Sequence, residues 1–171
     1  MASPVPSHRL PARPEGEIAL ADRQLPPLAH DYTAWLITSL AARLSRGASS
    51  YYSREWNIGS TEYRLLMALG GMDEADACSA ISAATAADID KAAASRSLQV
   101  LQGEGLVETV RLGREMRIRL TDAGRRLRAK LKKASDRRDR RLTHGMSAGE
   151  VARLRADLHR LIVNLPLMNE D

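Results

Sequence analysis

The spacing of apolar residues changes near the middle of the chain, and this change constrains the fold more than any other feature. Up to residue 105, apolar side chains recur at the spacing of amphipathic helices. In MRIRL (116–120) they alternate with arginines, as on a strand that buries one face. VETV (107–110) predicts a partner strand, with Gly113 in the turn between the two. The sequence thus predicts one β-hairpin over residues 106–120, with helices before and after it.

Four helices are predicted before the hairpin, from their apolar spacing and from residues that favour helix ends. The first helix is expected over residues 28–52, and the second from Ser60 as N-cap to Gly70 and Gly71. The third is expected to be capped by Asp76 and to contain Cys78. The fourth is expected to run from Asp90 to Gly103 and Gly105.

Two helices are predicted after the hairpin. TDAG (121–124) begins a long polar helix that runs toward His144 and Gly145. In SAGE (147–150), serine and glutamate stand three positions apart, as in a capping box that starts a last helix. One side of that helix carries an apolar seam suited to helix pairing, formed by Val151, Leu154, Leu158, Leu161, Ile162 and Leu165. The seam is expected to pack on a second copy of the chain or on the chain's own first helix.

The N-terminal segment has a different composition. Six of the seven prolines lie in residues 1–27, so this segment is expected to be a flexible arm outside any core. The single cysteine, Cys78, excludes an internal disulfide and fits a reducing compartment. No apolar run approaches the roughly 20 residues that span a bilayer. We therefore expect a cytoplasmic protein with no membrane segment.

Positive charge is concentrated in residues 111–141. This stretch holds fourteen Lys and Arg against four Asp and Glu, a net charge of +10, whereas the whole chain carries +5. Such an asymmetry predicts binding to a polyanion or to an acidic membrane surface. Beyond Arg125 the alternative is a solvated helix, and residues 125–141 are too polar for a helix that lies on a membrane.

The fourth predicted helix has two distinct faces when residues are placed about 100° apart. The apolar side carries Ala94, Leu98 and Leu101, with Ala93, Ser97 and Val100 beside them. The other face has two cations, small or polar residues and no carboxylate: Lys91, Ala92, Ser95, Arg96, Gln99 and Gln102. Small residues allow a helix to enter a major groove, and carboxylates there would repel phosphates.

Arg96 and Gln99 are the candidate base-reading residues. Arginine bridges guanine or holds a phosphate, and glutamine pairs with adenine. Lys91 is expected to contact a phosphate, which positions a protein without reading sequence. The alternative is a surface helix on which Arg96 is simply solvated.

The order of helices, hairpin and helices is that of a winged helix-turn-helix with added helices, and it resembles the MarR family of transcriptional regulators. Three segments carry the resemblance: STEYRLLMALG matches the family's second helix, DKAAASRSLQVLQGEGLV its recognition helix with the Ser-Arg pair and Gly-Leu-Val exit, and RIRLTDAGRRL its Leu-Thr-x-x-Gly entry to the long helix. The match covers roughly residues 30–165. It implies a mainly α fold with a winged helix-turn-helix over residues 59–120. It also implies a homodimer built from a helical dimerisation region that both termini supply, residues 28–58 and 121–171.

The predicted wing departs from the family pattern. Family wings usually carry an aspartate-rich tip followed by arginine, whereas TVRLGREMR is shorter and has only Glu115. Three arginines surround its turn: Arg111, Arg114 and Arg117. One of them is expected to enter the minor groove, whose negative potential attracts arginine.

All six aromatic residues lie between positions 32 and 63, and there is no phenylalanine. In the family that this chain resembles, the junction of the dimerisation and DNA-binding parts holds the effector pocket. Flat aromatic walls with polar tips suit a phenolic ring, and an arginine suits its carboxylate. The candidate effector-binding residues are Tyr32, Trp35, Arg46, Tyr51, Tyr63 and Arg64. The alternative is that these rings only form the core of a hinge region.

The sequence therefore predicts a transcriptional repressor that binds an inverted repeat in double-stranded DNA and is released by a small aromatic carboxylate, such as a benzoate, a cinnamate or a thioester of one. The alternative is an architectural DNA-binding protein without an effector. No nucleophile–base arrangement, phosphate loop or metal-ligand spacing is present in the sequence, so we expect neither an enzyme nor a cofactor.

Overall fold

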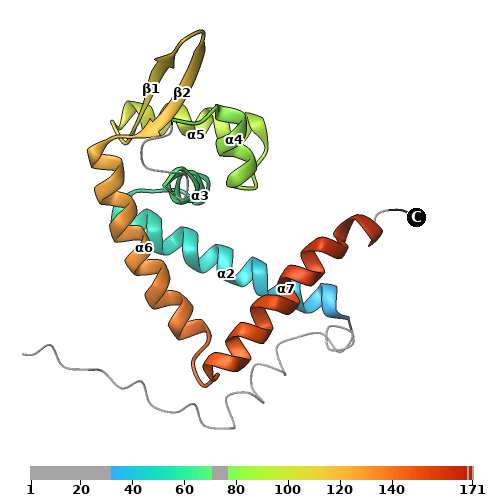
Figure 1. Ribbon diagram of the computed structural model, residues 1–171. Coiled ribbons are helices and arrows are strands. Elements are labelled where there is room, and N and C mark those ends of the chain that lie inside the picture. Colours follow the sequence, from blue (N-terminus) through green and yellow to red (C-terminus); the bar gives the residue numbers. More distant parts are fainter. Residues whose placement is uncertain (1–31, 71–76, 169, 171) are drawn as a thin grey trace, which may run out of the picture. The chain divides into compact units, whose positions relative to one another are not determined.

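The computed structural model describes residues 32–70, 77–168 and 170 of the chain. Its described part contains six helices and a two-stranded antiparallel sheet (Figure 1). The elements are α2 (Thr33–Trp56), α3 (Ser60–Leu69), α4 (Ala80–Ala86), α5 (Lys91–Gly103), β1 (Val107–Leu112), β2 (Glu115–Leu120), α6 (Asp122–Leu142) and α7 (Ala148–Met168). The predicted order of helices, hairpin and helices is confirmed, while the predicted arm over residues 1–27 lies outside the described residues.

The chain divides into two compact units. One contains residues 29–137, from α2 through most of α6. The other contains residues 1–28 and 138–171, and its described part is the end of α6 together with α7. The predicted DNA-binding region, residues 59–120, lies within the first unit.

The start of α3 differs from the prediction by one residue. Gly59, not Ser60, is the N-cap, and its carbonyl accepts a hydrogen bond from the Tyr63 amide at 2.9 Å. A Cβ on Gly59 would lie 2.2 Å from the Glu62 carboxylate, so a side chain at the cap position would have to displace the end of that glutamate. Gly70 ends the helix as predicted, and Gly71 lies outside the described residues.

The start of α4 corrects a second prediction. Ser79 caps the helix by accepting a hydrogen bond from the Ser82 amide, whereas Asp76 lies outside the described residues. Cys78 is not helical but forms an isolated bridge to Ile118, with N–O distances of 2.9 and 2.8 Å in the two directions. Because this pairing holds the backbone extended up to Cys78, the helix begins only after Ser79.

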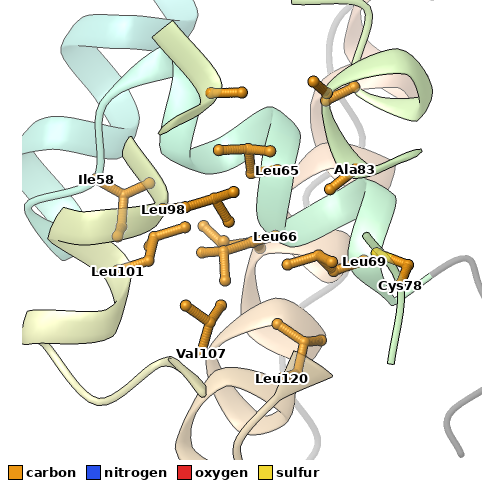
Figure 2. Packing of buried hydrophobic residues seen from close by; sticks show 14 of the residues in the cluster. Ile58, Leu65, Leu66, Leu69, Cys78, Ala83, Leu98, Leu101, Val107 and Leu120 are labelled. Carbon is orange, nitrogen blue, oxygen red and sulfur yellow. The ribbon is translucent and has the colours of Figure 1, made fainter. Parts of the chain in front are cut away.

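The core of the first unit lies where α3, α5 and the hairpin meet (Figure 2). Leu65 and Leu66 of α3 and Leu101 of α5 are completely buried. Burying a leucine side chain contributes about 1.5–3 kcal/mol relative to leaving it exposed. The buried residues of α5 are Ala94, Ser97, Leu98 and Leu101, as the two-face prediction requires. Val100 was expected beside them but is half exposed.

The contacts at the start of α6 account for Thr121 and Gly124 in the sequence. The Thr121 hydroxyl donates to the Gly105 carbonyl at 2.6 Å and accepts from the Gly124 amide at 3.1 Å. A Cβ on Gly124 would lie 2.0 Å from the Leu106 carbonyl oxygen, so this helix approaches the backbone before β1 too closely for any side chain.

A polar contact joins α6 to two other helices of the first unit. The Tyr52 and Tyr63 hydroxyls lie 2.9 and 2.8 Å from the Ser135 hydroxyl, which itself donates to the Leu131 carbonyl. Since serine has one proton to donate, both tyrosines must donate to Ser135. The two tyrosine rings stack with centroids 4.3 Å apart.

In the second unit, α7 begins with the predicted capping box. The Ser147 amide donates to Glu150 at 2.7 Å, and the Glu150 amide donates back to the Ser147 hydroxyl. None of the described residues of α7 is buried, and the seam residues Leu158 and Leu161 are each 38% exposed.

Candidate DNA interface

The α5 helix presents the predicted polar face to solvent. Asp90 caps the helix by accepting a hydrogen bond from the Ala93 amide at 2.8 Å, which fixes where the exposed face begins. Every residue predicted for this face is exposed: Lys91, Ala92, Ser95, Arg96, Gln99 and Gln102. Arg96 and Lys91 make no hydrogen bond or ion pair with any residue that the structure describes.

A salt bridge supports the turn that leads from α4 to α5. Asp88 adopts a left-handed backbone conformation there, with φ of 50°. Arg64 of α3 donates to both the carbonyl and the carboxylate of Asp88, the latter at 2.9 Å. Arg64 was predicted to bind an effector, and in the structure it links α3 to the turn of the helix-turn-helix. No local sequence signal predicts this contact, because the partners are 24 positions apart.

The hairpin turn is built around Gly113. Leu112 pairs with Glu115, so Gly113 and Arg114 form a two-residue turn, and Gly113 has a φ of +63°. A positive φ only at the first turn residue is the pattern of a type II′ turn, in which glycine is preferred at that position. The predicted hairpin is therefore confirmed, with Arg114 at its tip.

The wing arginines differ in how far they are already engaged. Arg117 donates to Glu115 at 2.7 Å and to the Ala77 carbonyl at 3.3 Å, and it is half buried. Arg111 is exposed and donates to the Gly113 carbonyl at 3.2 Å. Arg114 is exposed and has no hydrogen bond or ion pair among the described residues. Of the three predicted wing contacts, Arg114 is thus the most available to a ligand and Arg117 the least.

The aromatic residues do not form one group. Tyr51, Tyr52, Trp56 and Tyr63 contact one another, with ring centroids 4.3–6.0 Å apart. Tyr32 and Trp35 lie at the opposite end of α2, where they are 61% and 50% exposed. Trp35 and Tyr51 are sixteen positions apart in one helix, about 24 Å along the axis. One copy of the chain therefore does not bring Trp35 and Tyr51 to the same small ligand.

The arginines predicted to hold an effector carboxylate are also separated. Arg64 is paired with Asp88, as described above, and Arg46 is an exposed residue of α2. Arg54, which was not among the predicted residues, does contact the aromatic group: its guanidinium carbon lies 6.0 Å from the centroid of the Tyr51 ring.

Three further observations concern the described residues. Burial raises the pKa of the Cys78 thiol, against smaller lowering effects of a backbone hydrogen bond and the charge of Arg117. The described residues hold no group of three or more His, Cys, Asp and Glu side chains able to bind a metal ion. None of the described helices is both long enough and apolar enough to cross a membrane.

Comparison with solved structures identifies the fold. A MarR/EmrR family transcriptional regulator from Acinetobacter sp. ADP1 superposes with a TM-score of 0.71 at 25% identity, over 81% of this chain and 98% of that one. A MarR family regulator from Silicibacter pomeroyi gives 0.67 at 22% identity, over 90% and 97%. MepR of S. aureus, in a complex with DNA, gives 0.69 at 18% identity, over 78% and 96%. The sequence matches no protein-family model and no curated protein.

Proposed function

We propose that this chain, which has the fold of the MarR family of transcriptional regulators, is a homodimeric repressor that reads DNA with α5 and the hairpin and is released by a small aromatic carboxylate. The observation that carries the DNA-binding part is the exposed face of α5. It combines small and amide side chains with two cations that pair with no described residue, and it has no carboxylate among Lys91–Gly103.

The chemistry of this face suits a major groove. Ala92 and Ser95 are short enough to let the helix axis approach the base edges, and Arg96 and Gln99 are long enough to reach them. Arg114 at the hairpin tip extends the positive surface and suits a phosphate or the minor groove. Arg111 and Arg117 have to break existing hydrogen bonds before they can bind DNA. We therefore assign them smaller contributions to the affinity for DNA.

The dimer proposal rests on the exposed apolar side chains of two helices. On α7 the seam includes Leu158 and Leu161, and on α2 the exposed residues include Trp35, Leu36 and Leu40. Helices with such stripes gain stability by burying them against another helix. A two-fold dimer presents two copies of α5, which predicts an inverted repeat with half-site centres about 10 base pairs, or a multiple of that, apart.

The effector proposal rests on the aromatic group on α2 and α3. Tyr51 is half exposed, forms an edge contact with Trp56, and has Arg54 over its ring, so an aromatic ring with a carboxylate has suitable partners there. Tyr63 is committed to its stack with Tyr52. If these rings only pack against each other, the alternative of an architectural protein without an effector is favoured instead.

Selection of a preferred site from a random duplex library tests the DNA-reading proposal. We expect an inverted repeat, and Arg96→Ala should weaken binding to the selected site by about 1–3 kcal/mol while leaving random DNA less affected. Arg43→Ala, at an exposed position of α2, is the matched arginine control. Equal losses on selected and random DNA would reduce Arg96 to a phosphate contact, and the absence of any preferred site would favour the architectural alternative.

A titration of the complex tests the effector proposal. Benzoates, cinnamates and their thioesters are added to the protein with and without the selected duplex, and their heats of binding are compared. Linkage requires DNA to weaken the ligand by the same factor by which the ligand weakens DNA binding. A ligand that binds equally in both titrations is not the switch, and a panel without any binder returns the aromatic group to a packing role.

A further inference from the structure

The α6 helix carries a second basic surface that is separate from α5 and the hairpin. Arg126, Lys130, Lys133 and Arg137 are all exposed. Their spacing of four, three and four residues places them within about 60° of one another around the helix. They extend along about 16 Å of its axis. We call these four residues the α6 stripe.

The charges on α6 are sorted between its faces. Asp122 pairs with Arg125, and Asp136 pairs with Lys132 at 3.1 Å. Both of these pairs use cations that lie outside the α6 stripe. The four stripe residues make no hydrogen bond or ion pair with any residue that the structure describes. Besides the hydrogen bond and charge of Arg125, the charge of Arg126 also helps to lower the pKa of Asp122, and Asp136 is three residues after Lys133 but pairs with Lys132. From Arg126 to Arg137, the exposed face of the stripe therefore holds more cations than carboxylates.

A helix that is merely solvated has no physical reason for this sorting. Like charges at spacings of three and four destabilise a helix, whereas opposite charges at the same spacings stabilise it. The chain uses the stabilising arrangement in Lys132 and Asp136 and in Asp122 and Arg126, but four cations still follow one another along the stripe at the destabilising spacing. An anionic ligand that neutralises the stripe removes this repulsion.

We propose that the α6 stripe binds the phosphate backbone of a second segment of double-stranded DNA. One strand of B-DNA carries a charge about every 3.4 Å of its axis, so the stripe extends along several phosphates. Its neighbour Ala129 is small and exposed, so the stripe is not flanked there by a bulky apolar anchor of the kind that protein partners and membranes require.

The position of the stripe points to a segment other than the one that α5 reads. Gly124 at the start of α6 packs on Leu106 at the base of the hairpin. From this point the hairpin and α6 extend in opposite directions (Figure 1). The stripe residues follow along α6, away from the tip of the hairpin. The stripe thus adds a contact beyond the proposed reading of an operator.

The test compares two double variants of the full chain that remove equal charge from the same helix. Lys130→Gln/Lys133→Gln removes two stripe cations, and Arg125→Gln/Lys132→Gln removes the two paired cations beside it. Binding to a random duplex of about 30 base pairs is measured over a range of salt concentrations. Each lost phosphate contact lowers the slope of log affinity against log salt by about 0.9. We expect a decrease of about 1.8 for the stripe variant and little change for the control.

Repeating the comparison in an Arg96→Ala/Arg114→Ala background separates this proposal from the proposed operator reading. A stripe-dependent slope that persists in that background supports a second site. Equal slopes for the stripe and control variants, or a difference that disappears in that background, overturn the proposal. If the stripe variant loses binding to poly-glutamate but binds the duplex as the unmodified protein does, the proposal is also overturned, in favour of an acidic protein partner.

Discussion

The helix-turn-helix region and α7 contain similar apolar side chains but use them differently. Leu65 and Leu66 of α3 are completely buried against α5 and other elements of the same unit. On α7, Ile162 is 61% exposed and no described residue of the helix is buried. The first region therefore obtains its shape from contacts within its own unit, whereas the described residues leave the apolar seam of α7 exposed.

The first prediction breaks the proposed dimer at α7. Leu158→Glu places a charge within the seam, and we expect a monomer in analytical ultracentrifugation. A monomer binds only one half-site at a time. Its affinity for the selected inverted repeat should therefore fall by a factor of about 10²–10⁴. Val163→Glu is the control, because Val163 is 75% exposed and lies on the opposite side of α7 from the seam. The same oligomeric state for both variants would contradict the dimer proposal.

The second prediction concerns the internal packing of the first unit. Gly124→Ala forces α6 away from the Leu106 carbonyl, and overpacking of this kind costs about 1–3 kcal/mol of the free energy of unfolding. Gly103→Ala is the control, since a Cβ at Gly103 would meet nothing within 4 Å. Urea denaturation of both variants measures the difference. Equal midpoints would show that the contact at Gly124 relaxes without cost.

The third prediction concerns the hydroxyl contact between α6 and the tyrosines. Ser135→Ala removes the hydroxyl to which Tyr52 and Tyr63 both donate, which costs about 1–3 kcal/mol of the free energy of unfolding if no water replaces it. Removing both tyrosine hydroxyls in the Ser135→Ala variant, by Tyr→Phe substitutions, should restore part of that loss. Ser53→Ala, at an exposed position of α2, serves as the control. A double-mutant cycle without coupling would show that these hydroxyls act independently.

The smallest expected effect is a pH dependence at the start of α7. Hydrogen bonds from the Ser147 hydroxyl and amide lower the pKa of the Glu150 carboxyl. Their stabilisation of the helix start is complete above the ordinary pKa of a glutamate and is lost as the pH falls through the lowered folded value. Glu150→Gln should abolish this acid dependence of the α7 amide signals in NMR. A titration that is the same in both proteins would rule out Glu150 as its source.

Two site predictions depended on contacts that only the fold reveals. Arg117 alternates with apolar residues in the sequence like an outward-facing strand residue, yet Glu115 and the Ala77 carbonyl hold its guanidinium. Trp35 and Tyr51 are close enough in sequence to suggest one pocket, but the straight path of α2 separates them. A residue type predicts the chemistry that a side chain is capable of, and its neighbours in space determine whether that chemistry is available.

The sequence by itself determined the features that arise between residues a few positions apart. Asp90 reaches the Ala93 amide, Ser147 and Glu150 cap α7 together, and glycine at position 113 permits the tight hairpin turn. Their physical cause is local backbone geometry, so periodicity and turn residues are sufficient to predict them.

Only the tertiary structure decided the features that join distant residues. The pairing of Cys78 with Ile118 moved the start of α4 from the region of Asp76 to Ser79. The contact between Arg64 and Asp88 converted a candidate ligand-binding arginine into a support for the helix-turn-helix. These partners are 40 and 24 positions apart. Their free energy of interaction exists only after the helices have packed, which is why no local pattern in the sequence carries it.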